Sequence, residues 1–371
     1  MKIGFDAKRL FLNYTGLGNY SRAIVKDLQK YYPEHEYHLY TTKVLKNTDT
    51  EAFFNQSKFV IHENSSLLNS YWRSRTIVRD LERDGIDVFH GLSAELPIGI
   101  KSSRVKSVVT IHDLIFRYYK SDYNVVDRFI YNFKSKYACN NADKIVSISD
   151  FTKNDIVNSY GINDEKIVVV YLQISDRFTM RADEDKLKIV KRKFDLPNRF
   201  FLYVGSVIGR KNLKLVLKAM FNIDKKSRIP LVVVGSGKKY MEEVKQLVRD
   251  RGLVDSIIFL KDIDNEALPI IYQLAEFFVF PSLYEGFGLP VLEAIQSGKK
   301  CIVSEETSLV EVVGDCGLVL KQNDIEAMKN AIEAMIQSPA GIIDCTKHLA
   351  KFDPELISSK IMGIYKSLIS I

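Results

Sequence analysis

The sequence predicts an α/β protein built from two Rossmann-like domains. The chain has 371 residues, which is long for one hydrophobic core and favours two domains. Short apolar segments alternate with longer helical segments, and each apolar segment ends in polar residues or glycine. This alternation is typical of a doubly wound parallel sheet. A charged segment, residues 176–197, interrupts the alternation and divides it into two series.

The first series predicts an N-terminal domain over residues 1–178. Its expected strands lie at residues 1–7, 35–42, 86–91, 106–113, 144–149 and 167–172. The amphipathic segment at the end of the chain, residues 354–371, predicts a last helix. We expect this helix to pack back onto the N-terminal domain.

The second series predicts a C-terminal domain over residues 196–353. Its expected strands lie at residues 199–206, 230–237, 256–262, 275–282, 299–305 and 316–321. In open parallel sheets, ligands bind beyond the carboxyl ends of the strands. We expect the two sheets to face each other across an interdomain cleft, with the functional motifs just after strands.

Composition and charge narrow the class of protein. Apolar residues make up 46% of the chain and charged residues 27%, as in ordinary folded proteins. The net charge of +7 suits an anionic ligand or an acidic membrane surface. Without a long basic block or a nucleic-acid-binding motif, a nucleic-acid partner is not expected. The start of the chain shows no signal peptide, and we find no apolar run of about 18 residues. We therefore expect a cytoplasmic protein, with peripheral attachment to the inner membrane face as an alternative.

The four cysteines are widely spaced along the chain. They are Cys139, Cys301, Cys316 and Cys345, and none forms a CxxC pair. This spacing predicts neither a zinc site nor a disulfide framework. We expect buried, reduced thiols.

The first candidate site motif is TGLGNYSR, residues 15–22, between the first strand and a helix. Without side chains at Gly16 and Gly18, backbone N–H groups there can approach a phosphate or a sugar closely. The alternative is an ordinary glycine turn.

The second motif is YVGSVIGRKNL, residues 203–213. A strand ends at Gly205, and Arg210 and Lys211 begin the next helix. Two cations at a helix N-terminus oppose the helix dipole, and a bound anion would reverse that cost. Arginine can hold two phosphate oxygens and lysine acts as a point charge. The alternative is a solvated basic turn.

The third motif is TIHDLIF, residues 110–116. His112 and Asp113 follow a very apolar strand at its carboxyl end. Acid–base chemistry, binding of sugar hydroxyls, and helix capping by Asp113 all remain open.

The fourth motif is PSLYEGFGLPVLEA, residues 281–294. Pro290 fits a first helical position, which would place Glu293 within about the first turn. Glu285 lies in a glycine-flanked loop. The two acids could bind hydroxyl groups, Glu293 those of a ribose and Glu285 those of a hexose. A glycosidase also uses paired carboxylates. However, a glycosidase does not need the phosphate site that Arg210 and Lys211 indicate.

A DxD pair offers a competing metal site. Asp262 and Asp264, in KDIDNEAL, could hold Mg²⁺ or Mn²⁺ against a nucleotide diphosphate. A helix follows this polar loop, so capping and solvation explain the pair. We expect no metal site.

In this order, the motifs resemble the family 4 retaining glycosyltransferases of GT-B fold, nearly from end to end. The most specific part is the E-x7-E arrangement in SLYEGFGLPVLEA. It is supported by TGLGNYSR, HGLSAELP, TIHD, VSISDFTKNDI, VGSVIGRKNL and VVGSG. HGLSAELP and IHDLIFRYY are most similar to bacterial mannosyltransferases that build surface polysaccharides.

The resemblance implies roles for the acids and bases of the C-terminal domain. Arg210 and Lys211 would hold the donor diphosphate and neutralise its charge as it leaves. Glu293 would bind the donor ribose, and Glu285 would contact the transferred sugar. The remaining donor-binding positions in this domain would be Gly205 and the backbone of Phe287, Gly288 and Leu289.

The resemblance also implies roles in the N-terminal domain. Gly16 and Gly18 would close over the donor, and His112 would lie beside the sugar and the reacting centre as a catalytic residue. Ser147 and Ser149 would line the floor of the cleft.

The implied reaction moves a hexose from a nucleotide-diphosphate sugar to an acceptor hydroxyl, with retention at the anomeric carbon. Mannose from GDP-mannose is the first candidate, and the acceptor would be a saccharide or a lipid-linked saccharide. No cofactor or metal ion is expected, since Arg210 and Lys211 supply the charge. Two alternatives remain, a nucleotide-sugar epimerase of GT-B fold and a non-catalytic sugar-nucleotide-binding assembly subunit.

A separate segment, residues 116–138, interleaves basic and aromatic residues. This composition suits a lipid headgroup surface or a glycan. The alternative is a helix whose aromatic rings face the core.

Overall fold

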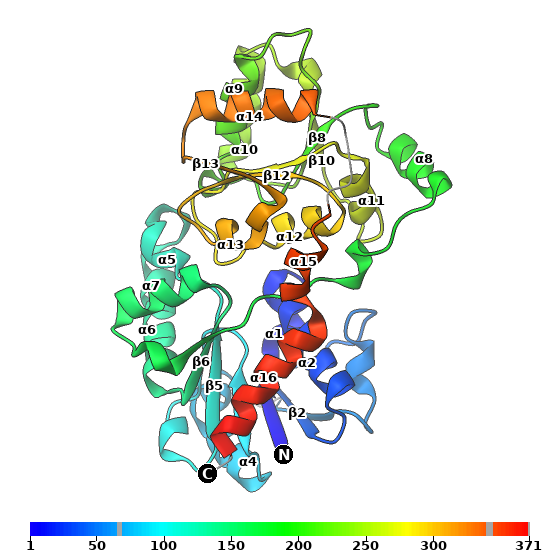
Figure 1. Ribbon diagram of the computed structural model, residues 1–371. Coiled ribbons are helices and arrows are strands. Elements are labelled where there is room, and N and C mark those ends of the chain that lie inside the picture. The colour runs from blue at the N-terminus through cyan, green and yellow to red at the C-terminus, as the bar shows by residue number, and fades with distance from the viewer. Residues whose placement is uncertain (65–68, 339–343, 370–371) are drawn as a thin grey trace. The chain divides into compact units, whose positions relative to one another are not determined.

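The computed structural model describes residues 1–64, 69–338 and 344–369. The chain divides into two compact units, shown in Figure 1. Unit 1 comprises Met1–Gln173 and Phe352–Ile371, and unit 2 comprises Ile174–Lys351. Each unit contains one parallel sheet with helices around it.

The sheet of unit 1 has seven parallel strands in the order β3-β2-β1-β4-β5-β6-β7. The strands are β1 (Lys2–Asp6), β2 (Glu36–Thr41), β3 (Val60–Glu63), β4 (Val88–Gly91), β5 (Lys106–Ile111), β6 (Lys144–Ser147) and β7 (Ile167–Val169). The inner strands are buried along nearly their whole length, because helices cover both faces of a parallel sheet. β3, at the edge of the sheet, was not predicted from the sequence.

The helices of unit 1 connect successive strands. They are α1 (Lys8–Leu12), α2 (Gly16–Tyr31), α3 (Asn69–Tyr71), α4 (Ile77–Arg83), α5 (Ile115–Tyr118), α6 (Val125–Asn141) and α7 (Asp150–Tyr160). A π-helical turn, Trp72–Thr76, joins α3 to α4.

The C-terminal helix α16 (Pro354–Ile369) completes unit 1 and runs beside α2 (Figure 1). Its residues Ile361 and Tyr365 are fully buried in the same apolar cluster as Phe5 of β1. The Tyr365 hydroxyl lies 2.6 Å from Nδ1 of His90, which is itself buried at the end of β4. Residues 370 and 371 of the predicted helix lie outside the described residues.

The sheet of unit 2 has six parallel strands in the order β10-β9-β8-β11-β12-β13. They are β8 (Phe201–Val204), β9 (Leu231–Val234), β10 (Ile257–Leu260), β11 (Phe278–Phe280), β12 (Cys301–Ser304) and β13 (Gly317–Leu320). Counted within the unit, this is the 3-2-1-4-5-6 order of the Rossmann fold. The predicted class, α/β with two Rossmann-like domains, is confirmed.

The helices of unit 2 are α8 (Glu184–Lys193), α9 (Leu213–Phe221), α10 (Lys239–Asp250), α11 (Ala267–Leu274), α12 (Leu289–Gln296), α13 (Leu309–Val313), α14 (Ile325–Gln337) and α15 (Thr346–Leu349). The charged segment expected to connect the domains belongs to this unit. Arg181 donates a hydrogen bond to the Ser297 carbonyl (2.9 Å), and Gln273 donates one to the Met180 carbonyl (2.9 Å). α8 packs against α11.

The expectation that the cysteines form no disulfide is wrong for one pair. Cys316 and Cys345, 29 residues apart, are bonded through their sulfurs. Cys316 ends the turn after α13, and Cys345 directly precedes α15. The pairing was missed because no short spacing marks it in the sequence. Cys139 and Cys301 are free, buried thiols, as expected.

Candidate functional site

Four polar side chains lie together at the carboxyl ends of β8 and β11 in unit 2. They are those of Arg210, Lys211, Ser282 and Glu285. β8 leads into a short 3₁₀ turn, Gly209–Lys211, and β11 leads into residues 281–288, which we call the glutamate loop. β8 and β11 are neighbours, and the strand order reverses between them. This is the topological switch point, where open parallel sheets bind their ligands.

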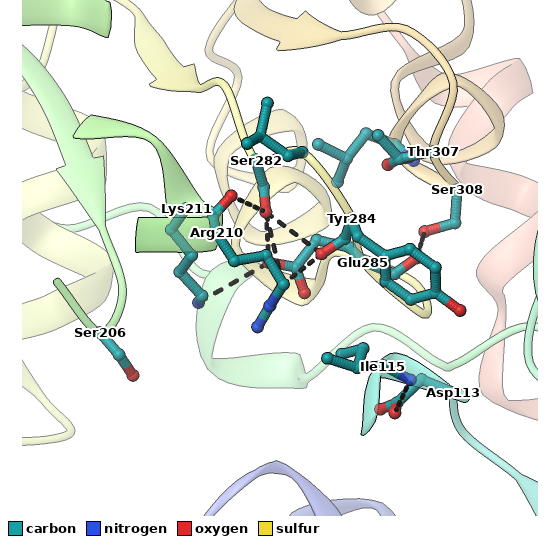
Figure 2. Close-up of polar contacts among 12 residues, drawn as sticks. Asp113, Ile115, Ser206, Arg210, Lys211, Ser282, Tyr284, Glu285, Thr307 and Ser308 are labelled. Carbon is teal, nitrogen blue, oxygen red and sulfur yellow. Dashed lines mark hydrogen bonds and ion pairs between the residues drawn. The ribbon is translucent and has the colours of Figure 1, made fainter. Parts of the chain in front are cut away.

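Arg210 fastens the glutamate loop to the 3₁₀ turn. Its buried guanidinium lies 2.9 Å from Oε1 of Glu285 and also donates to the Tyr284 carbonyl. Oγ of Ser282 lies 3.4 Å from Nη1 of Arg210, and the Leu283 N–H donates to the Arg210 carbonyl (2.8 Å). Figure 2 shows the Arg210 and Lys211 side chains extending toward Glu285. A charge-assisted pair in a buried position fixes the carboxylate more firmly than a neutral contact would.

Lys211 presents the second cation. Its ammonium lies 4.0 Å from Oε1 of Glu285 and 4.9 Å from the centroid of the Phe280 ring. Burial lowers the pKa of Lys211, and the charge of Glu285 opposes that shift. Gly205 leaves room for this side chain, because a Cβ on Gly205 would stand 2.8 Å from the ammonium nitrogen. Gly205 also has φ of +148°, which disfavours any side chain.

Further hydrogen bonds hold the rest of the glutamate loop. The Ser308 hydroxyl lies 2.8 Å from the Glu285 carbonyl and 3.0 Å from the Phe287 carbonyl. Gln322 donates to the Leu283 carbonyl (3.1 Å) from the other side. The Phe287 ring is buried, so this residue can offer a ligand mainly its backbone.

The glutamate loop ends where α12 begins. Gly288 is the N-cap residue with φ of +105°, and a Cβ there would stand 2.3 Å from Leu309. Pro290 is the second residue of α12, one position later than predicted. The Leu289 N–H begins α12 without a partner within the helix, whereas Pro290 has no N–H and the N–H groups of Val291 and Leu292 donate to the Gly288 carbonyl. The positive end of the helix dipole also lies here. An anion is therefore favoured at this position.

Glu293 is the fifth residue of α12, so it lies just beyond the first turn in which the sequence placed it. Its side chain is 19% exposed, with Oε2 accepting a hydrogen bond from the Tyr272 hydroxyl (3.0 Å). Arg177 Nη2 stands 3.9 Å from Oε1. Burial raises the pKa of Glu293 to about 7, although Arg177, Tyr272 and Lys211 each act to lower it. The carboxyl is therefore poised between its two protonation states at neutral pH.

Sequence reasoning missed the partners of the two glutamates. Arg177 lies in the charged segment that was expected to be a connector, and Tyr272 is a fully buried residue of α11. Ser308 reaches the Glu285 carbonyl from the loop before α13, whereas Ser282 lies three residues from Glu285 in the glutamate loop itself. Nothing in the local sequence marks the contacts of Arg177, Tyr272 and Ser308, which are distant along the chain.

His112 lies in unit 1, at the end of β5. Its Nε2 is 2.9 Å from the Leu92 carbonyl, which can only accept, so Nε2 carries the hydrogen. Burial lowers the pKa of His112 to about 4, so the ring is neutral at pH 7 and Nδ1 is an acceptor. The neighbouring Asp113 accepts a hydrogen bond from the Ile115 N–H (3.1 Å), but the N-cap residue of α5 is Leu114, so the N-cap position expected for Asp113 is wrong by one residue.

The two glycines of TGLGNYSR begin α2 in unit 1. Asn13 Oδ1 accepts hydrogen bonds from the N–H groups of Thr15 (2.9 Å) and Gly18 (3.2 Å). A Cβ on Gly18 would stand 1.7 Å from the Asn13 carbonyl oxygen, so tight packing alone requires that glycine. Around Gly16 there is open space, and its predicted role at the donor stays a prediction.

The structure also bears on the serines of the SIS segment and on the DxD pair. Ser147 and Ser149 are fully buried, with Ser149 capping α7, so the expectation that they line an open floor is wrong. Asp264 accepts from the Ala267 N–H (2.6 Å) and pairs with Lys193 (2.8 Å), as capping and solvation predicted. Among the described residues, no group of three His, Cys, Asp or Glu side chains could hold a metal ion.

Unit 1 carries an ionic cluster at its own switch point, between β1 and β4. Arg73 bridges Asp6, at the end of β1, and Glu95, after β4, with Nε 3.0 Å from Asp6 Oδ1. Lys134 stands 3.3 Å from Glu95. Burial opposes ionisation of Asp6, yet Arg73 holds its pKa below the usual value. This cluster presents fixed charges suited to hydroxyl groups, and the sequence analysis did not identify it.

The fold places the protein in the GT-B class. A glycosyltransferase from Rickettsia africae ESF-5 matches it with a TM-score of 0.76 at 18% identity, covering 100% of this chain and 98% of that one. Anabaena HepE in complex with UDP and glucose matches with a TM-score of 0.74 at 14% identity, covering 99% of both chains. At these identities the likeness establishes the fold alone.

Sequence comparison identifies the family. The family model "Glycosyltransferase Family 4" matches residues 14–175, and "Glycosyl transferases group 1" matches residues 184–352. O-antigen chain mannosyltransferase B of Escherichia coli is 30% identical over 352 residues, which is 91% of each chain. The chain therefore belongs to the family 4 glycosyltransferases, and the similarity to bacterial mannosyltransferases is confirmed.

Proposed function

We propose that this glycosyltransferase moves mannose from GDP-mannose to a saccharide or lipid-linked saccharide acceptor, with retention at the anomeric carbon, in the synthesis of a surface polysaccharide. The observation that carries this proposal is the cluster of Arg210, Lys211, Glu285 and Glu293 at the switch point of unit 2. The similarity to an O-antigen mannosyltransferase supports the choice of sugar. The complex of HepE with UDP and glucose supports a nucleotide-type donor.

The donor diphosphate would bind between Lys211 and the first turn of α12. With Glu293 ionised, the three positive charges of Arg210, Lys211 and Arg177 face the two carboxylates of Glu285 and Glu293, and the surplus of one positive charge favours an anion. The Lys211 ammonium is beyond hydrogen-bond distance of Glu285, at 4.0 Å, and can turn its donors to phosphate oxygens. The Leu289 N–H at the start of α12 would add a neutral donor.

The two glutamates would divide the rest of the donor between them. Glu293, held by Tyr272 and Arg177, would accept hydrogen bonds from the ribose hydroxyls in its ionised form. Glu285, held by Arg210 and Ser282, would accept from hydroxyls of the mannose. In unit 1, the Asp6–Arg73–Glu95 cluster suits hydroxyls of the acceptor.

In the transfer step, the bond between the anomeric carbon and the diphosphate oxygen breaks, and a bond to the acceptor oxygen forms on the same face. Negative charge grows on the departing diphosphate, where Lys211 and Arg210 stabilise it. The departing phosphate oxygen takes the acceptor proton, so a separate base is not required. His112, neutral at pH 7, would offer Nδ1 as a hydrogen-bond acceptor beside the sugar.

Metal independence is part of the proposal, because the two cations take the place of a divalent ion. Transfer should proceed unchanged in EDTA. Loss of transfer in EDTA, restored by Mn²⁺, would count against this and would return Asp262 and Asp264 to consideration. We also propose a cytoplasmic location, which cell fractionation against a cytoplasmic marker enzyme would test.

The direct test is incubation with GDP-mannose in the presence and absence of oligosaccharide acceptors. A mannosylated product with an α-linkage, identified by NMR, would support the proposal, since the mannose of the donor is also α-linked. A β-linked product would contradict retention. Conversion of the donor without an acceptor would indicate the epimerase alternative, and donor binding without any turnover would indicate a non-catalytic subunit.

A further inference from the structure

One face of α6 exposes four large apolar side chains. Val125, Val126, Phe129 and Phe133 are exposed by 75%, 66%, 73% and 56%, and we call them the α6 apolar face. Their spacing places them on one side of the helix. The alternative that the aromatic rings of this segment face the core is therefore wrong for Phe129 and Phe133, although Phe116 is buried as that alternative predicts.

The side of α6 that packs on unit 1 explains why the apolar face is exposed to solvent. The residues that α6 buries in unit 1 are small, Ser135, Ala138 and Cys139, and they lie in its second half. No residue in the first half is buried. The helix start is nevertheless well formed, because the Asn124 side chain accepts a hydrogen bond from the Asp127 N–H (2.8 Å).

Basic residues lie close to the α6 apolar face in the sequence. Residues 117–137 contain five basic side chains, Arg117, Lys120, Arg128, Lys134 and Lys136, against the two acidic side chains of Asp122 and Asp127. Lys120 and Lys136 are exposed. An apolar strip with basic neighbours is the composition of helices that lie in the headgroup region of an anionic bilayer.

The chemistry of the face favours a lipid over a glycan. Sugars bind to proteins through stacking on aromatic rings with hydrogen bonds at their edges, and half of this face is valine. Phe133 and Tyr137 do stack, with ring centroids 6.5 Å apart, so a glycan remains an outcome that the experiment must distinguish. Among the residues that the structure describes, no helix is long and apolar enough to cross a membrane.

We propose that the α6 apolar face docks this protein on an anionic lipid bilayer, with its phenylalanines among the acyl chains and its lysines at the headgroups. The inference extends the proposed function, because it would bring unit 1 to a lipid-linked acceptor. It rests on the surface of α6 and not on the donor site.

The experiment is co-sedimentation of the full chain with vesicles of phosphatidylcholine alone and of phosphatidylcholine with phosphatidylglycerol. We expect binding to the anionic vesicles that weakens as salt increases. The double variant Phe129→Ser/Phe133→Ser should bind the anionic vesicles at least about tenfold more weakly than the parent, because the apolar burial of two rings is lost. The matched control is Ile189→Ser/Val254→Ser, which removes two exposed apolar side chains from unit 2 and should bind as the parent does.

Three results would overturn the proposal. The first is that the parent does not bind anionic vesicles. The second is that the α6 variant binds these vesicles as tightly as the parent does. The third is that the α6 variant loses binding of an oligosaccharide while it still binds vesicles. Circular dichroism and affinity for GDP-mannose would confirm that the α6 variant is folded. If vesicle binding depends on α6 but the parent transfers no mannose, the docking surface stands and the proposed function fails.

Discussion

Replacing Glu293 with glutamine should abolish a pH dependence of donor binding. Burial raises the pKa of Glu293 to about 7, and the ribose hydroxyls need the ionised carboxylate as their acceptor. With that pKa, about a tenth of the molecules are ionised at pH 6 and about nine tenths at pH 8. The parent protein should therefore bind GDP-mannose roughly tenfold more tightly at pH 8 than at pH 6. Glu293→Gln should bind weakly at both.

Isothermal titration calorimetry with GDP-mannose is the suitable assay. Both phosphates of this donor are esterified, whereas a terminal phosphate titrates near pH 6 and would obscure the effect. Lys299, whose pKa burial lowers to about 8, also titrates in this range. Lys299 precedes β12 and therefore lies at the amino ends of the strands, whereas the glutamate loop lies at their carboxyl ends. Because Glu293→Gln keeps Lys299, any pH dependence that comes from Lys299 should appear in both parent and variant. An equal pH dependence in parent and variant would refute the role of Glu293.

The raised pKa of Glu293 also predicts how the stability of the protein without nucleotide depends on pH. Stability should fall with rising pH, whereas donor binding should become tighter. The folded pKa of Glu293 lies above its unfolded value of 4.5, so the folded state holds the proton more tightly. Stability should fall as pH rises from about 4.5 to 7 and then level off, by roughly 3 kcal/mol at most. Glu293→Gln should thus raise the melting temperature at pH 8 more than at pH 5. A lower melting temperature at pH 8 would show that the carboxylate stabilises the empty site.

Three more substitutions follow from the same contacts. Tyr272→Phe removes a donor to the carboxylate, so the midpoint of the binding profile should move to higher pH, and an unchanged midpoint would contradict the contact. Gly205→Ala should displace Lys211 and reduce mannose turnover at least tenfold with some loss of stability, and parent-like turnover would argue against this packing. Cys345→Ser opens a closed loop whose link contributes about 3.5 kcal/mol. A reducing agent should then lower the melting temperature of the parent but not of this variant, and equal responses would contradict the disulfide.

The parallel sheets were predictable because strands buried on both faces are continuous apolar runs bounded by turns. β3 was not predicted because it is a short edge strand with exposed ends, Val60 and Glu63, so its sequence is not a continuous apolar run. The charged segment was expected to link the domains, but the contacts of Arg177, Met180 and Arg181 show that it packs on unit 2.

The candidate site was partly predictable for a topological reason. Arg210 and Glu285 each follow a strand, and β8 and β11 turn out to be neighbours, so the two side chains meet. The partners of Glu293 were not predictable, because Tyr272 reads as an ordinary apolar helix residue. The exposed rings of α6 were left undecided, since the pattern of a helix does not say which of its sides the rest of the fold covers.

The turnover of GDP-mannose by Lys211→Met, compared with that by Lys214→Met, tests for a diphosphate site in this cluster. Lys214 lies three residues away but pairs with Glu243 at 2.6 Å, outside the cluster, and serves as the matched control. Loss of a well-placed cation beside the leaving diphosphate costs about 3 kcal/mol, which is a rate loss of roughly a hundredfold. The account predicts that loss for Lys211→Met, with normal folding, and near-parent turnover for Lys214→Met. Turnover by Lys211→Met equal to that of the parent would contradict a diphosphate site in this cluster.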